Sequence, residues 1–92
     1  MIRGTTEQGF EFNVDEMILN DWRFLNAVVD VDSGDASRMI RGISDVSRLI
    51  LGDEGIKELQ NFISEKNDGY IPIAQMEKTM LEIISSLRNG KK

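Results

Sequence analysis

The chain has 92 residues, a formal net charge of −5, 40% hydrophobic residues, and neither cysteine nor histidine. This length suits one domain with a modest core, and the missing residue types exclude disulfides, thiolate metal sites and histidine acid-base chemistry. The acidic balance disfavours binding to nucleic acid or to an anionic membrane. No apolar run approaches bilayer length, so we expect a cytoplasmic protein.

Apolar and polar side chains alternate strictly over residues 10–14, with the sequence FEFNV. This period predicts a half-buried strand, whose backbone groups must find a partner. Three partners fit the sequence: residues 2–6 in a hairpin, residues 70–73, or a strand of another copy. We expect residues 1–14 to form a short extended arm.

From Asp15 the apolar period becomes helical and predicts a helix over residues 15–31, with a break near Asn20 as a variant. Two apolar stripes follow this helix. One stripe consists of Ile18, Trp22, Leu25 and Val29, and the other of Phe24, Val28 and Val31. We expect Trp22 and Leu25 in the core, because large aromatic residues give a small domain the most burial per residue. The stripe that carries Phe24 then faces a neighbour or a client.

Two more helices are predicted around a glycine. The first covers residues 36–51, with Asp35 as its N-cap, and the second covers residues 53–66. Gly52 between them suits the end of a helix. Gly42 inside the first helix indicates either close packing or a local weakness. The buried positions predicted for the two helices are Met39, Ile43, Val46, Ile50, Ile56, Leu59 and Ile63.

The last predicted helix begins near Pro72, which fits a first helical turn, and ends at 89–90. Its apolar stripe consists of Ile73, Met76, Met80, Ile83 and Leu87. The elements together predict a mainly α fold, a small bundle of about four helices over residues 15–90 preceded by a short N-terminal β-strand or hairpin arm. A tail at 91–92 completes a single domain over residues 1–92.

Acidic residues cluster at three places, and each place has a structural explanation. The segment from Asp30 to Asp35 opens like a calcium loop, but the pattern fails at its twelfth position, which is Arg41. The acidic pairs at 15–16 and 53–54 stand at predicted helix starts, where the helix dipole stabilises negative charge. No nucleophile has a base to activate it. We therefore expect helix caps, no metal, no cofactor and no enzymatic activity.

Several short motifs occur in one order along nearly the whole chain. They are Gly4-Thr5-Thr6, Gly9-Phe10-Glu11-Phe12, Val14-Asp15, Asp21-Trp22-Arg23-Phe24-Leu25, Asp32-Ser33-Gly34, Leu51-Gly52-Asp53-Glu54 and Asp68-Gly69-Tyr70-Ile71-Pro72. In this order they resemble the tail assembly chaperones of long-tailed (siphovirus-type) phages and prophages of Gram-positive bacteria. The resemblance implies a small helical protein of the bacterial host cytoplasm that self-associates and does no covalent chemistry. It also implies that the chain binds the tape measure protein. This binding keeps the hydrophobic helical segments of the tape measure protein soluble until tail-tube subunits polymerise around that protein.

A binding surface is predicted on the arm and on the first helix. An extended arm can add to a sheet edge, and methionine adapts to varied partners. The predicted protein-binding residues are Phe10, Phe12, Met17, Phe24 and Val28. The alternative is that the arm covers the chain's own helices. The predicted partners are the tape measure protein, the tail-tube protein and further copies of the chain. Two other functions stay open, a self-assembling structural or scaffolding subunit that uses strand exchange and a small acidic regulatory protein.

Overall fold

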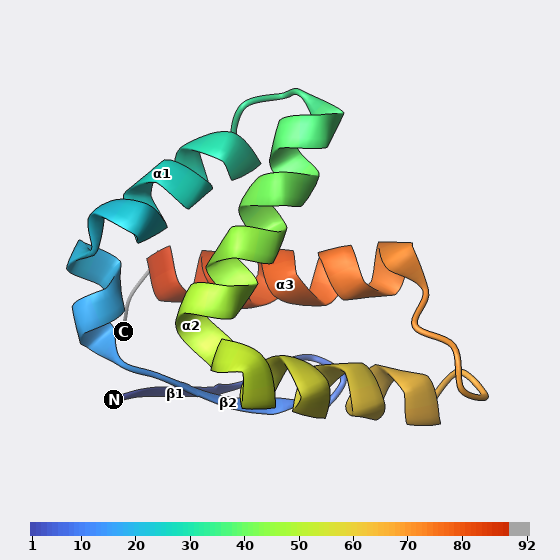
Figure 1. Cartoon of the computed structure of the whole chain (residues 1–92). Coiled ribbons are helices and arrows are strands. Elements are labelled where there is room, and N and C mark those ends of the chain that lie inside the picture. Colours follow the sequence, from blue (N-terminus) through green and yellow to red (C-terminus); the bar gives the residue numbers. More distant parts are fainter. Residues whose placement is uncertain (89–92) are drawn as a thin grey trace.

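The computed structural model describes residues 1–88, in which a β-hairpin precedes three α-helices (Figure 1). The elements are β1 (Ile2–Thr5), β2 (Glu11–Val14), the 3-10 helix η1 (Glu16–Asn20), α1 (Trp22–Val31), α2 (Ala36–Glu65) and α3 (Ile73–Arg88). The mainly α class with an N-terminal hairpin is confirmed. The predicted helix end at 89–90 and the tail at 91–92 lie outside the described residues.

Helix α2 bends sharply at Gly52, where φ is +71° and ψ is 175°. Side chains are strained in this backbone conformation, so glycine is what allows the turn. We call residues 36–51 the first arm and residues 53–65 the second arm. The two helices predicted here form one bent element, so the expected number of about four helices is wrong, and residues 1–88 contain three.

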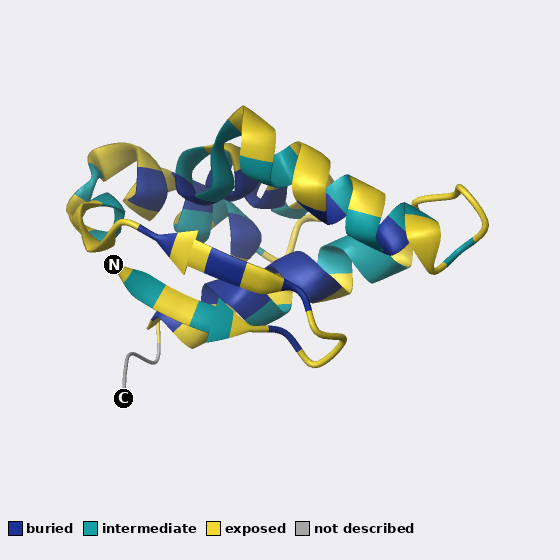
Figure 2. Cartoon of the chain, turned by 90° about the horizontal axis from the view of Figure 1, so that it is seen from below, coloured by how far each residue is buried: buried dark blue, intermediate teal, exposed yellow. Residues whose placement is uncertain are grey.

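The hairpin pairs β1 with β2 in antiparallel register, from Ile2 opposite Val14 to Thr5 opposite Glu11. The strand thus takes the first of the three partners that the sequence allowed. Along β2, Phe12 and Val14 are buried while the polar residues Glu11 and Asn13 are exposed, so the predicted alternation is confirmed. Figure 2 shows the hairpin from its open side, with the helices behind it.

The hairpin and the helices share one core. Phe10 meets Phe62 of the second arm edge to face, with ring centroids 5.5 Å apart, and the Phe12 ring lies over Gly4. The completely buried large side chains are Leu59, Ile63, Met80, Ile83, Ile84, Val14 and Val46. The N-terminal hairpin therefore covers the chain's own helices, because its aromatic side chains fill space that the second arm of α2 leaves open.

Helix α1 packs on the first arm of α2 through its buried residues Phe24, Ala27 and Val31. The two helices come very close at Gly42, where a Cβ atom would lie only 2.6 Å from the Ala27 carbonyl oxygen. Close packing is therefore the reason for the glycine inside this helix.

The opposite stripe of α1 faces outward. Trp22 is 70% exposed, and Leu25 and Val29 are each 52% exposed. The predictions that Trp22 and Leu25 lie in the core and that Phe24 faces a neighbour are therefore wrong. The physical reason is the close approach at Gly42, where the α1 backbone at Ala27 and Val31 lies against α2 and the side of α1 that carries Phe24 is buried.

Aspartates begin η1, α1 and α2, and the sequence indicated the acidic helix start at Asp15 and the N-cap at Asp35. The Asp21 carboxylate accepts the Arg23 N–H at 2.8 Å, and its extended backbone separates η1 from α1. The predicted break in the helix over 15–31 therefore occurs one residue after Asn20. The Asp15 carboxylate caps η1 by accepting the Met17 N–H at 3.0 Å.

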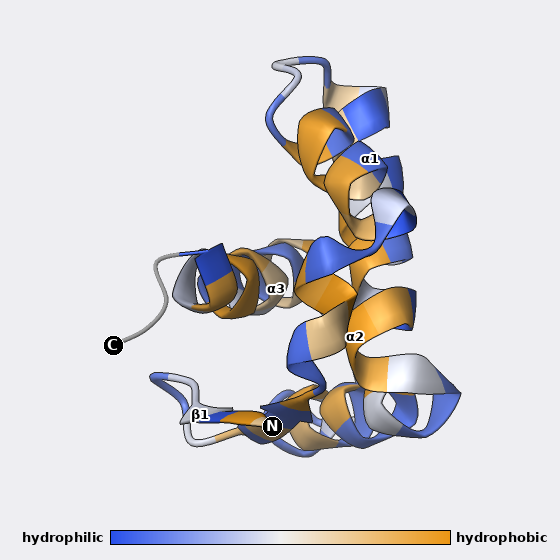
Figure 3. Ribbon diagram, turned by 90° about the vertical axis from the view of Figure 1, so that its left-hand side faces the viewer, coloured by the Kyte–Doolittle hydropathy of each residue, from blue (hydrophilic) through white to orange (hydrophobic). Residues whose placement is uncertain are grey.

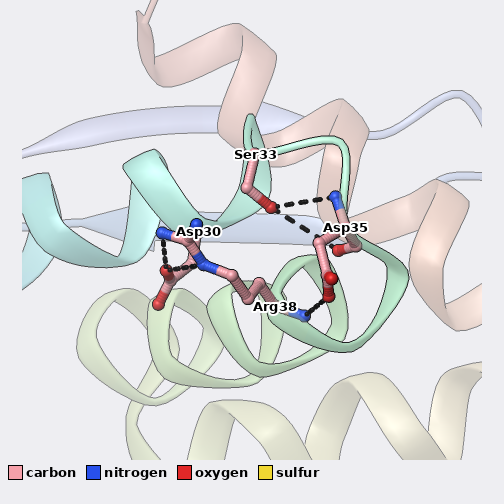
Figure 4. A network of polar contacts seen from close by, with 4 residues as sticks. All are labelled: Asp30, Ser33, Asp35 and Arg38. Atoms are coloured by element: carbon pink, nitrogen blue, oxygen red, sulfur yellow. Dashed lines mark hydrogen bonds and ion pairs between the residues drawn. The ribbon is translucent and has the colours of Figure 1, made fainter.

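The acidic loop before α2 is a capping network (Figure 4). The Asp35 carboxylate accepts the Arg38 N–H at 3.0 Å, which confirms the predicted N-cap. The Arg38 guanidinium lies 3.0 Å from the Asp30 carboxylate, and the Ser33 hydroxyl accepts the Asp35 N–H at 3.2 Å. These acids therefore join α1 to α2.

Candidate protein-binding surfaces

The five residues predicted for protein binding do not share one surface. Phe10, Phe12 and Phe24 are each at most 7% exposed, and Val28 packs half-buried against the same core. Met17 on η1 is 72% exposed. Four of the five are thus brought to the core, and Met17 alone offers most of its side chain to a partner.

A groove on the inner side of the α2 bend collects apolar side chains from three parts of the chain. Its volume is about 360 Å³, at the small end of the range of ligand pockets. Its apolar lining consists of Ile40, Ile43, Ile56, Ile71, Ile73 and Met76. We call this set the isoleucine groove. Two of its members, Ile73 and Ile40, are 76% and 53% exposed.

The groove has a polar rim with one pair of opposite charges and one acid. Arg48 lies 3.5 Å from Asp45 and donates to the Ser44 hydroxyl at 3.3 Å, so its charge is already met within the chain. Glu77 is half-buried at the groove, and its carboxylate has no ion pair or hydrogen bond with any residue of the described part, 1–88. The unmatched charge of the rim is therefore negative.

A second apolar surface is the outer side of α1. Hydrophobic residues recur along this helix (Figure 3). We call Trp22, Leu25 and Val29 the α1 stripe. Their spacing of three and four residues places them along one side of a helix. Each is more than half exposed, but they lie on a convex helix rather than in a groove.

A bidentate ion pair stands at the start of the α1 stripe. The Arg23 Nε and Nη2 atoms donate to the two Asp21 carboxylate oxygens at 3.0 and 2.8 Å. These side-chain hydrogen bonds, with the backbone bond to the same carboxylate, lower the pKa of Asp21 to about 2. They also raise the pKa of Arg23. Both groups stay charged near neutral pH and neutralise each other.

Buried hydroxyls offer nothing to a ligand, because each serves the backbone nearby. The Ser47 hydroxyl donates to the Ile43 carbonyl at 2.7 Å, and the Thr79 hydroxyl donates to the Gln75 carbonyl at 2.8 Å. The Thr6 hydroxyl accepts the Phe10 N–H at 3.0 Å. Within residues 1–88 no buried side-chain nitrogen or oxygen is left without a partner.

The sequence pattern does not predict the isoleucine groove, because it places one of its residues in the core. Periodicity places Ile73 on the buried stripe of the last helix, but as the first residue of α3 it is 76% exposed and lines the groove. Met76, on the same stripe, is half-buried, whereas Met80 is buried as predicted. The signal in the sequence that points to the groove is Ile40. It lies next to the predicted stripe residue Met39 but outside the buried stripe, so its own helix does not bury it.

Neither metal-ligand clusters nor membrane spans occur in the part of the chain that the structure describes. Residues 1–88 contain no group of three or more acidic residues placed to hold a metal ion. No helix among them combines the length and the apolar character needed to cross a bilayer. Comparison with protein-family models, curated proteins and solved structures finds nothing that matches the chain.

Proposed function

We propose that this chain is a tail assembly chaperone of a long-tailed phage or prophage, which binds the tape measure protein without covalent chemistry. The single observation that carries the proposal is the isoleucine groove, because strongly exposed aliphatic side chains from separate elements converge on it. Contiguous apolar surface of this kind marks binding sites on small proteins. Ordered motifs like those of this chaperone family supply the identity of the client.

The motifs behind the resemblance have structural roles in this chain. Asp21 caps α1, Gly52 bends α2, and Gly69 adopts a φ of +94° in the turn before α3. Residues of this kind fix the lengths and directions of helices. A shared order of such residues supports a shared architecture, on which the surface side chains select the client.

The proposed mode of action is reversible binding in the cytoplasm of the bacterial host. The tape measure protein is the proposed client, the tail-tube protein is a further proposed partner, and the α1 stripe is available for contact between copies. No enzymatic step is proposed, because the sequence has no histidine or cysteine and the buried hydroxyls serve the backbone.

The hairpin favours a chaperone over a subunit that assembles by strand exchange. Phe10 and Phe12 fill the chain's own core, and β2 already has β1 as its partner. Exchange of the N-terminal hairpin would first have to open this core and separate Phe10 from Phe62.

Co-expression with the tape measure protein of the same genome tests the proposal. We expect the wild-type chain to increase the soluble fraction of the tape measure protein, as measured by centrifugation and immunoblotting. The control is the chain with Gly52→Val, which disturbs the α2 bend because valine is strained at a positive φ. An unchanged soluble fraction with folded wild-type chain would refute the proposed function.

A further inference from the structure

We propose that the isoleucine groove binds an amphipathic helical segment of the client, and that a lysine or arginine beside its apolar face pairs with Glu77. This inference rests on the proposed function and adds the kind of segment that is recognised. It is carried by the composition of the groove, by the state of its polar groups and by the charges at its rim.

The groove favours a helix over an extended peptide. An extended segment brings unpaired N–H and C=O groups, and these must be bonded when they are buried. The groove can bond few of them, because its walls are largely helical and the Ser47 hydroxyl is committed to the Ile43 carbonyl. A helix satisfies its own backbone and presents only side chains.

The size of the groove limits what a helix can insert. A volume of about 360 Å³ has room for a few side chains, not for a whole helix. The apolar side chains of an amphipathic helix repeat at three and four residues on one side, so successive turns can each place one side chain there. The exposed side chains of Ile40 and Ile73 would then be covered.

The charge of the rim selects a basic segment. Arg48 is already held by Asp45, whereas the Glu77 carboxylate has no partner among residues 1–88. The chain as a whole has a net charge of −5, which attracts cations and repels acidic segments. A cation beside Glu77 therefore strengthens binding both by pairing with this carboxylate and by its attraction to the net negative charge of the chain.

The same charges argue against a second copy of this chain as the occupant. Outside the isoleucine groove, the exposed apolar helix stripe that residues 1–88 of a second copy offer is the α1 stripe. The cation next to that stripe is Arg23, which is held in two hydrogen bonds by Asp21. It brings no free positive charge to Glu77.

The test uses fluorescence anisotropy with labelled peptides of about 20 residues, which span roughly 30 Å as a helix and are tiled along the tape measure protein. We expect the bound peptides to carry an apolar helical stripe and at least one lysine or arginine near it. Ile40→Asp should weaken their binding at least about tenfold, because it puts a charge at the centre of an apolar contact. The matched control is Val29→Asp on the α1 stripe, since Val29 is 52% and Ile40 is 53% exposed.

The role of Glu77 is tested by exchanging charges. Glu77→Lys should weaken the binding of the basic peptides by about fivefold, as expected for a partly exposed ion pair. Replacing the basic residue of the peptide by glutamate should restore binding to Glu77→Lys and weaken binding to the wild-type chain. Circular dichroism spectra and melting curves verify that each variant is folded.

Several results would overturn the inference while leaving the proposed function intact. They are loss of binding in Val29→Asp but not in Ile40→Asp, preference for acidic peptides, and full solubilisation of the tape measure protein by Ile40→Asp. A mass that falls from oligomer to monomer in Ile40→Asp, measured by sedimentation, would show that a second copy covers the groove. By contrast, a wild-type chain that binds no peptide and solubilises no tape measure protein would remove the function and the inference together.

Discussion

Helix α1 has two apolar sides with opposite environments. On one side Phe24, Ala27 and Val31 are buried against α2. On the other side Trp22 and its stripe are more than half exposed, although tryptophan is the larger aromatic residue. Hydrophobicity and spacing are similar on the two sides, so neither property decides which side is buried.

The deciding feature is the pair of small residues between the helices. Because a Cβ atom at Gly42 would lie 2.6 Å from the Ala27 carbonyl oxygen, the two backbones can approach this closely only where residue 42 has no side chain, and Ala27 is itself small. Large side chains then pack beside this contact, as Phe24 does. The α1 stripe has no small residue, so its side chains have no comparable place to dock within the chain.

The largest effect should come from the buried side. Phe24→Ala removes a buried ring and should lower the free energy of unfolding by about 3–5 kcal/mol. This is a large part of the stability of a small domain. Urea unfolding followed by circular dichroism measures it. A loss below about 1 kcal/mol, within the usual range for surface sites, would mean that Phe24 does not hold α1 to α2.

The contact between the helices can be tested next. Gly42→Ala adds one methyl group and should destabilise the chain by about 1–3 kcal/mol through overpacking. Helix propensity alone predicts the opposite sign, a gain of up to about 1 kcal/mol. The sign of the change in the urea midpoint therefore decides. A stabilised variant would show that α1 and α2 do not approach closely at this position.

The exposed side should give a much smaller effect. Trp22→Ala should change the free energy of unfolding by no more than about 0.5 kcal/mol, as surface substitutions do. In the wild-type chain at low concentration, the fluorescence emission of Trp22 should lie close to that of the unfolded chain, because the ring is 70% exposed. Emission that shifts to shorter wavelength as the concentration rises would identify the α1 stripe as a contact between copies.

Much of the fold could be predicted from local chemistry. The strand at 10–14, the cap at Asp35 and the special role of Gly52 each follow from a few neighbouring residues. The choice between the two sides of α1 could not be made this way. It depends on Gly42 and Ala27, which are 15 residues apart, and on a close contact that periodicity does not describe.

The candidate site was harder to predict than the fold. The isoleucine groove forms only because the bend at Gly52 brings Ile40 and Ile56 to the same side as Ile73. Ile56 and Ile73 each fit a helical stripe when their own segments are considered alone, and Ile40 lies next to one. Their exposure follows from the direction of the bend, which the sequence indicates as a break but not as an angle.

The smallest effect concerns the charge pair that begins the exposed stripe. Hydrogen bonds from Arg23 lower the folded-state pKa of Asp21 from 3.8 to about 2. A carboxyl with a lowered pKa stabilises the folded chain above its unfolded-state pKa, and the contribution disappears as the pH falls through the folded-state value. Asp21→Asn keeps a good N-cap while it removes the charge.

The urea midpoints of the wild-type chain and of Asp21→Asn should therefore differ by a constant amount from about pH 6 to about pH 4, and converge toward about pH 2. Arg23→Gln removes the other member of the pair and should show the same dependence on pH, because the hydrogen bonds of Arg23 are the main cause of the lowered pKa. A difference for Asp21→Asn that persists at about pH 2 would assign the effect to capping geometry instead of charge. In that case the pair of Asp21 and Arg23 would add no stability to the folded chain, although its two charges still cancel beside the α1 stripe.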